Sequence, residues 1–260
     1  MPSVYAHYIF GKEVLKHLNG EVKNLIEENK ELYSIGLHGP DICFFYRPLL
    51  IGNRITRMGS RLHNENALPF FQAAREKIKN PEEMAYILGF ICHFMLDSEC
   101  HPYINANAEK GIAEHFKQES DFDRYLLCKE GKNPIRENLT GHIFATKKNA
   151  ALIQPFFSEA TEKIIWKSLD YMISTTKKLQ APTKLERALL KGAFHLTGQY
   201  KKLSGLLMPE KPDLECIQTS QWLEKKLFQA VKPSTVIVQE YYEGRCSNAP
   251  LNIRFNRNYK

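Results

Sequence analysis

The chain has 260 residues, of which 43% are hydrophobic and 25% are charged, a composition that excludes fibrous and intrinsically disordered classes. Its formal net charge of +7 suits an anionic ligand such as a phosphate ester, and it suits a merely soluble basic surface equally well. Lysines and arginines are spread along the sequence rather than gathered in one block, so the charge pattern does not favour nucleic-acid binding.

No stretch of the sequence predicts a transmembrane segment. The longest apolar stretch, residues 84–96, is too short to span a bilayer and contains His93. The first residues lack the basic and apolar regions of a secretory signal peptide. The six cysteines form no C-x-x-C pair, so we expect reduced thiols and a cytoplasmic location.

Helical periodicity runs through nearly the whole chain. Apolar residues spaced by three and four predict a first helix over 10–26. Residues 31–69 contain several Gly and Pro and predict an irregular loop with short helices, a kind of segment that is usually functional. Asn80 followed by a proline predicts the start of a helix over 81–99, which we expect to end before Pro102.

The second half of the chain predicts further helices. They are expected over 110–127, 157–179, 183–203 and 219–231. Thr183 and Glu186 predict a capping box at the start of the third of these. Only residues 235–238 predict a short strand. With no internal repeat or low-complexity linker, the sequence predicts an all-α, single-domain multi-helix bundle over residues 1–260.

Two pairs of potential metal ligands recur at helical spacing. His93 and Asp97 lie four residues apart on one predicted helix, and His115 and Glu119 repeat the spacing on the next. His101 follows Asp97 by four more residues. A buried histidine on an apolar helix is usually a hydrogen-bonded core residue, but a buried carboxylate beside it is costly without a cation. Imidazole and carboxylate are groups that zinc accepts, so the pattern favours a metal site.

These motifs occur in the order typical of one family. The chain contains His7 in AHYIFG, GPD at 39–41, His63 in GSRLH, H-x-x-x-D-x-x-x-H-P-Y over 93–103 and H-x-x-x-E over 115–119. In this order they resemble the zinc-dependent phospholipase C family, which shares a helical fold with single-strand nucleases. The resemblance covers residues 5 to about 125. From residue 130 onward the likeness is only that of further helix.

The resemblance implies two or three zinc ions in one cleft. The first would be held by Asp41, His63, His93 and Asp97, the second by His101, His115 and Glu119, and the third by His7, a bridging Asp97 and the amine and carbonyl of Pro2 after removal of Met1. If the terminus is frayed, only two ions are expected. Asp41 would act as a metal ligand or as a general base. Asp121 and Asp123 are candidates for orienting a ligand histidine.

The same resemblance implies the reaction. The chain would be a zinc-dependent hydrolase of phosphodiester bonds, in which metal-activated water attacks a phosphate-ester substrate such as a phospholipid. Two alternatives stay open. One is a nuclease or another phosphoesterase on the same trinuclear site, and the other is a metal-stabilised binding protein without turnover. The sequence does not identify the substrate or the oligomeric state.

Overall fold

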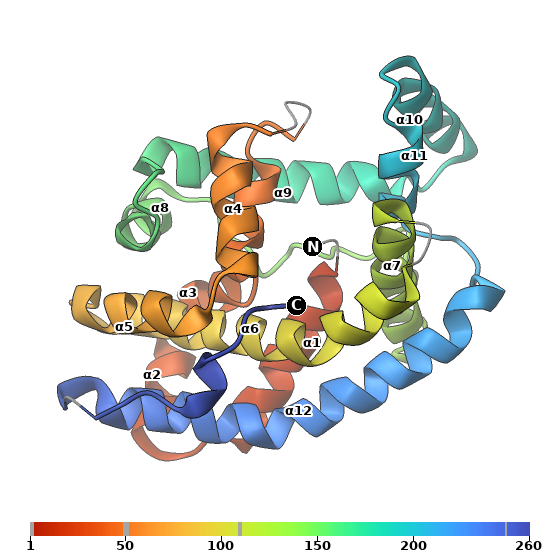
Figure 1. Ribbon diagram of the computed structural model, residues 1–260. Coiled ribbons are helices and arrows are strands. Elements are labelled where there is room, and N and C mark those ends of the chain that lie inside the picture. The colour runs from red at the N-terminus through yellow and green to blue at the C-terminus, as the bar shows by residue number, and fades with distance from the viewer. Residues whose placement is uncertain (1–2, 49–51, 109–110, 248) are drawn as a thin grey trace.

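The computed structural model describes residues 3–48, 52–108, 111–247 and 249–260 (Figure 1). Within these ranges all regular structure is helical and no strand occurs, so the predicted all-α class is confirmed. No described helix is long and apolar enough to cross a membrane. The α-helices are α1 (Val4–His17), α2 (Gly20–Glu28), α3 (Lys30–Gly36), α4 (Arg54–Asn64), α5 (Ala67–Lys77), α6 (Pro81–Asn107), α7 (Ile112–Lys129), α8 (Lys147–Ile153), α9 (Glu162–Gln180), α10 (Lys184–Leu196), α11 (Tyr200–Leu203) and α12 (Ile217–Glu243). The 3₁₀ turns are η1 (Gly39–Phe45), η2 (Gln154–Phe156), η3 (Ser204–Leu206), η4 (Leu214–Cys216), η5 (Gly244–Cys246) and η6 (Ile253–Phe255).

Helix α6 is the centre of the fold. It is buried along almost all of its length, and α1, α3 and α12 pack around it. In Figure 1 α12 runs along the bottom, α9 along the top, and α4 and α7 stand on either side of the amino-terminal end of α1. The ordered start of α6 comes from Asn80, whose side chain accepts a hydrogen bond from the backbone of Glu83, as the sequence predicts.

Two glycines let α3 cross α6 at backbone contact. A Cβ at Gly36 would lie 2.1 Å from the carbonyl oxygen of Tyr86, and one at Gly89 would lie 2.2 Å from that of Tyr33. Only glycine fits at such a crossing. The contact holds the segment after α3 against α6, and this segment leads directly into η1, which carries Asp41.

The predicted first helix and the predicted loop both differ from the structure. The chain breaks at Leu18 and Asn19, which are extended, and Gly20 has a φ of 61°, so α1 and α2 are separate helices. The apolar period continues across the break because Leu18 and Val22 are both buried. The region 31–69 contains the expected short helices but is more helical than an irregular loop. Gly36, Gly39 and Gly59 lie in close contacts, whereas Gly52 has a φ of 77° and open space around it.

Helix α6 continues past Pro102 to Asn107, so the expected end before this proline is wrong. A proline inside a helix removes one backbone hydrogen bond and strains the preceding turn. Here the last turns are held from outside the helix: Ile104 is buried in the core and the ring of His101 is bonded to another segment. Tertiary packing therefore outweighs the local preference of the proline.

The expected strand over 235–238 is also wrong, because these residues belong to α12. Ser234, Ile237, Val238 and Tyr241 are all buried. Their spacing of three and four places them on one helical face, against α6 and α1. A run of four residues is too short to show the helical period, and its β-branched side chains are of the types enriched in strands.

The remaining predicted helices occur with shifted bounds. The helix expected over 110–127 is α7, and the one expected over 157–179 is α9, which is preceded by the unpredicted α8. The segment 183–203 forms α10 and α11, separated at Gly198, whose φ is 67°. The capping box that opens α10 is present as predicted.

Candidate metal centre

Four helices and one 3₁₀ turn bring the eight predicted ligands within the described residues to one place. They are His7 on α1, Asp41 on η1, His63 on α4, His93, Asp97 and His101 on α6, and His115 and Glu119 on α7. The three residues on α6 follow one another at intervals of four and therefore share a face. Seven of the eight are buried, and only His115 is partly exposed, with 15% of its side chain accessible. Pro2 lies outside the described residues.

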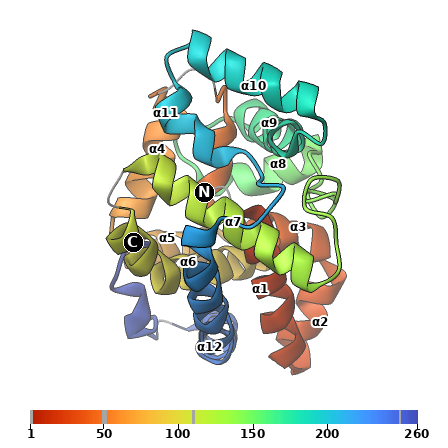
Figure 2. The same ribbon diagram turned by 90° about the vertical axis from the view of Figure 1, so that its right-hand side faces the viewer.

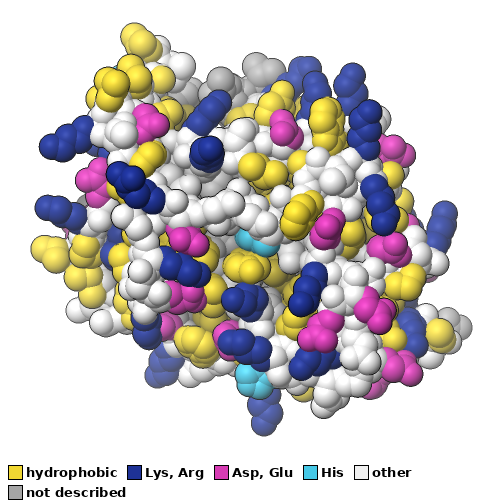
Figure 3. Space-filling model, turned by 180° about the vertical axis from the view of Figure 1, so that it is seen from behind, with side chains coloured by type: hydrophobic (Ala, Val, Ile, Leu, Met, Phe, Trp, Pro, Cys, Tyr) yellow, Lys and Arg dark blue, Asp and Glu magenta, His cyan; other side chains and the backbone are white. Residues whose placement is uncertain are grey.

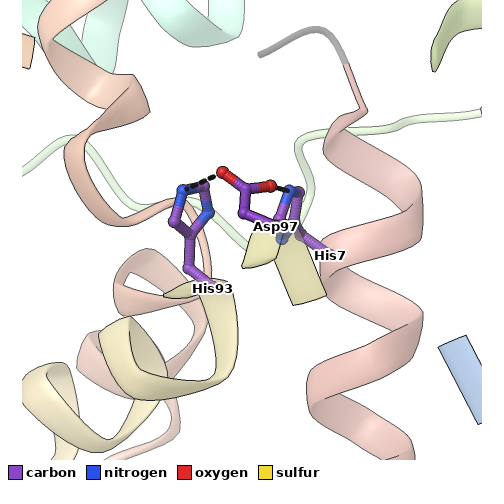
Figure 4. Close-up of side chains that lie close together, drawn as sticks. All are labelled: His7, His93 and Asp97. Carbon is purple, nitrogen blue, oxygen red and sulfur yellow. Dashed lines mark ion pairs between the residues drawn. The ribbon is translucent and has the colours of Figure 1, made fainter. Parts of the chain in front are cut away.

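The carboxylate of Asp97 lies at the middle of the cluster. Its Oδ1 is 3.2 Å from Nε2 of His7 and 3.7 Å from Nε2 of His101. Its Oδ2 is 3.1 Å from Nε2 of His93 and 3.7 Å from Nε2 of His63. Figure 4 shows Asp97 between the rings of His7 and His93, with helices α1 and α6 facing each other across the site. One carboxylate thus faces four imidazoles from three helices.

The cluster divides into three groups whose donor atoms lie within 4.8 Å of one another. They are His7 with His93 and Asp97; Asp41 with His63 and His93; and His101 with His115 and Glu119. The last group has the membership that the sequence predicts for one zinc ion. In the other two, the structure places His93 beside both His7 and Asp41, a sharing that the sequence does not predict. Whether these groups bind metal stays a prediction.

Four of the five histidines have the outer ring nitrogen, Nδ1, held by an oxygen. A hydrogen bond of this kind fixes the tautomer and leaves Nε2 free to bind a metal. The acceptors are the backbone carbonyls of Gly59 for His63 (2.7 Å), Leu37 for His93 (3.2 Å) and Tyr259 for His101 (2.8 Å), and the side-chain oxygen of Asn105 for His115 (3.0 Å). The Nε2 atom of each of these four histidines faces a carboxylate oxygen of the centre.

The buried carboxylates and imidazoles of the centre shift one another's pKa values. Burial acts to raise the pKa of Asp97, but the imidazoles, with His101 foremost, outweigh it and hold that pKa well below its usual range. Burial acts to raise the pKa of Glu119 as well, but the neighbouring His115 and His101 contribute to holding it well below its usual range. Burial acts to lower the pKa of His93 and His101, but the carboxylates raise both. For His7 burial prevails, and the pKa of its imidazole is lowered.

Two buried atoms test whether this donor set fits a metal ion. His93 Nε2 and Asp97 Oδ2 are 3.1 Å apart, yet within the described part of the chain neither makes a hydrogen bond. Buried polar atoms are rarely left in this way. Two ligands on one tetrahedral zinc, with bonds of about 2.0–2.1 Å, lie roughly 3.3 Å apart. The residues present therefore fit a zinc ion in donor type, burial and spacing.

Asp123 holds the start of α1 beside the centre. Its carboxylate accepts hydrogen bonds from the backbone of Tyr5 and Ala6 and from the hydroxyl of Ser3. Burial raises the pKa of Asp123 to about 7, against the opposing effect of these bonds. Neither Asp123 nor Asp121, which pairs with Arg124, holds a ligand histidine, so that expectation for both is wrong.

Several residues near the centre make contacts that the sequence does not predict. His38 is buried, and its Nε2 lies 2.7 Å from Nε2 of His142, which stacks on Tyr8. Tyr259 is buried beneath the centre, with its ring packed against His63. No spacing pattern could reveal these contacts, because the partners lie more than 100 residues apart.

A family model described as zinc-dependent phospholipase C matches residues 6–174. The matched range contains all eight predicted ligands that the structure brings together, from His7 to Glu119, and it ends within α9. No curated protein and no solved structure matches the chain.

Proposed function

Because the chain belongs to the zinc-dependent phospholipase C family, we propose that it hydrolyses phosphodiester bonds of the phospholipase C type, with zinc as cofactor and water as nucleophile. Zinc, when bound, lowers the pKa of water toward neutrality and neutralises charge on phosphoryl oxygens. The chain supplies the imidazole and carboxylate donors that zinc prefers, in a buried site where such charges act strongly.

The position of Asp97 is the observation that carries the proposal. A carboxylate surrounded by four imidazoles is not expected as a mere core-stabilising group. Attraction between buried charges offsets the free energy of their desolvation only when the geometry is excellent. Two of its contacts are longer than a hydrogen bond. An arrangement of this kind favours a shared ligand of a multinuclear centre over a structural ion pair.

We assign roles to the ligands as follows. Asp41, His63 and His93 would hold one zinc ion with Asp97; His101, His115 and Glu119 would hold a second; and His7 with Asp97 would contribute to a third. Asp41 Oδ1 lies 3.1 Å from Nε2 of His63, a separation that supports a ligand role for Asp41 more than a role as general base.

The proposed substrate is a phosphate diester, with phospholipid preferred. The net charge of +7 favours an anionic substrate in general. A nuclease or another phosphoesterase is the alternative within the same chemistry. We also propose a reducing compartment such as the cytoplasm, in keeping with the six cysteines, all of which have free thiols.

The first test is metal content. Protein purified without chelator is expected to contain two or three zinc ions per chain, measured by elemental analysis. The variant Asp97→Ala is expected to lose more than one ion, because this carboxylate faces two ligand groups. The control is His17→Ala, which removes an exposed histidine bonded only to the backbone of its own helix. Less than one zinc per chain in the wild type after zinc dialysis would overturn the assignment.

The second test is a substrate panel of phosphatidylcholine, single-stranded DNA and p-nitrophenyl phosphorylcholine. Hydrolysis of the choline esters and not of DNA is the expected result. Cleavage of DNA alone would replace the proposal by the nuclease alternative. No hydrolysis of any substrate by fully zinc-loaded protein would indicate a binding protein without turnover.

A further inference from the structure

Helix α10 presents apolar side chains to solvent at the top of the molecule. Leu185, Leu189 and Leu196 have 69%, 65% and 91% of their surface exposed. At 3.6 residues per turn the three lie within about 40° of one another on the helix. Phe194, the buried residue of this helix, points in the opposite direction. The leucine stripe therefore faces directly away from the protein.

Positive charge surrounds this stripe. Residues 177–203 contain seven lysines and arginines and one glutamate, so this short segment carries most of the net charge of the chain. The glutamate, Glu186, is engaged in the capping box of α10. Lys184 and Lys191 are exposed on one side of α10, about 100° and 120° around the helix from Leu185, and Lys201 is exposed on α11. Figure 3 shows hydrophobic and basic side chains together at the upper left, over the end of the molecule where α10 lies.

The α10–α11 hairpin, residues 184–203, stands apart from the main core. Phe194 belongs to a small cluster of its own with Ala181 and Leu207. Arg187 fastens the hairpin, because its guanidinium donates hydrogen bonds to the backbone carbonyls of Gln180 and Met208. Figure 2 shows α10 at the top of the molecule, at the opposite end from α12.

The segment that follows the hairpin packs against α7, the helix that carries His115 and Glu119. Residues 204–206, which follow α11, pack against α7. The hydroxyl of Ser120 on α7 donates a hydrogen bond of 2.8 Å to the carbonyl of Gly205. Ser120 follows Glu119 in the sequence, so the same helix, α7, contacts the segment after the hairpin and carries two residues of one candidate ligand group.

We propose that the leucine stripe and its flanking lysines dock onto an anionic phospholipid surface. Leucines on one side and lysines along the flank are the features of a helix that lies in a membrane interface. Anionic headgroups attract such lysines, and the apolar side chains enter the acyl boundary. The inference does not depend on the proposed hydrolysis, because docking requires no turnover. If the hydrolysis also occurs, the docked face brings the centre to its substrate.

The experiment is sedimentation of the full chain with vesicles of phosphatidylcholine alone or of equimolar phosphatidylcholine and phosphatidylglycerol. Binding to the anionic vesicles is expected to be strong at low salt and to weaken as salt is added. The variant K184Q/K191Q/K201Q is expected to bind about a hundredfold more weakly, at about fivefold per lysine. The variant L185Q/L189Q/L196Q is expected to lose at least about tenfold, and glutamine keeps the helix propensity of leucine.

Two matched controls separate docking from general charge and general hydrophobicity. K148Q/K163Q/K225Q removes the same charge from exposed lysines outside the hairpin, and F228Q/V236Q/I253Q removes exposed apolar side chains on α12 and η6. Both controls are expected to bind as the wild type does. Equal binding by the hairpin variants and their controls would overturn the inference.

Two further outcomes distinguish this inference from the proposed function. Hydrolysis of p-nitrophenyl phosphorylcholine without vesicle binding would retain the function and overturn the docking. Vesicle binding without hydrolysis of any ester would retain the docking and overturn the function. A wild type that is dimeric in solution, becomes monomeric in the leucine variant and ignores vesicles would assign the stripe to a second copy of the chain and overturn the inference.

Discussion

Substituting Asn105 by alanine tests the candidate centre at a position where the change is expected to affect the stability of the fold little. The side chain of Asn105 is exposed, and its oxygen accepts a hydrogen bond of 3.0 Å from Nδ1 of His115. Without this acceptor the imidazole can rotate, so that Nε2 no longer faces Glu119, or it can change tautomer, so that Nε2 carries the proton and cannot bind a metal. We expect Asn105→Ala to weaken the zinc ion held by His101, His115 and Glu119.

The expected loss of zinc affinity depends on how exposed the side chain of Asn105 is. Removing a residue that orients a metal-bound histidine typically costs between about 10-fold and 100-fold in metal affinity. Water can replace the exposed amide of Asn105, so the lower end applies, about tenfold or about 1.4 kcal/mol. Among the described residues, Asn105 is hydrogen-bonded to His115 and to no other predicted ligand, so a single zinc-binding step is expected to change.

The assay is a titration of chelator-stripped protein with zinc in competition with a fluorescent chelator. Asn107→Ala is the matched control, since Asn107 is exposed on the same helix and its amide bonds only to the backbone carbonyl of Tyr103. Circular dichroism verifies that both variants are folded. Identical zinc affinities at every step for the two folded variants would refute the assignment of His115 as a ligand oriented by Asn105.

Three other predictions concern the fold and the contacts of the centre. A chain ending at Asn258 is expected to bind zinc at the His101 group up to about a hundredfold more weakly, because it lacks the buried carbonyl of Tyr259. The variant Lys260→Ala keeps that carbonyl and is expected to change nothing; zinc titration compares the two. Gly89→Ala is expected to destabilise the protein by about 1–3 kcal/mol in urea unfolding, because the added Cβ meets a backbone oxygen. Gly192 has open space around it, so Gly192→Ala is expected to stabilise the protein by up to about 1 kcal/mol. Burial lowers the pKa of His142 from 6.5 to about 3, so the unfolded chain takes up this proton first and stability is lost as pH falls from 6.5 toward 3. His142→Asn is expected to show a shallower decrease of Tm with acid over that range, and equal slopes would contradict the prediction.

The sequence predicts the parts of the centre that follow from local spacing. His93 and Asp97 share a helical face because they lie four residues apart, and the same holds for His115 and Glu119. The start of α6 at Asn80 was predictable because capping is a local interaction.

The features that the sequence does not predict depend on distant packing. Helix α6 passes Pro102 because Ile104 and His101 are held by other segments, and a local rule has no access to those contacts. The carbonyl of Tyr259 bonds to a histidine 158 residues earlier in the sequence. Any residue can offer a backbone carbonyl, so no pattern of residue types marks this contact.

The wide separation of these partners also bears on how the protein is synthesised. His7 and Tyr259 lie near opposite ends of the given sequence, yet both reach the same cluster of side chains. His7 contacts Asp97, and the carbonyl of Tyr259 bonds to His101, whose ring faces the same carboxylate. Contacts between distant residues form late, because the intervening loop must be closed first. On the ribosome, the acceptor of His101 is missing until residue 259 has emerged. Zinc loading at its full affinity is therefore expected only after segment 249–260 has been synthesised and has packed beneath the histidines.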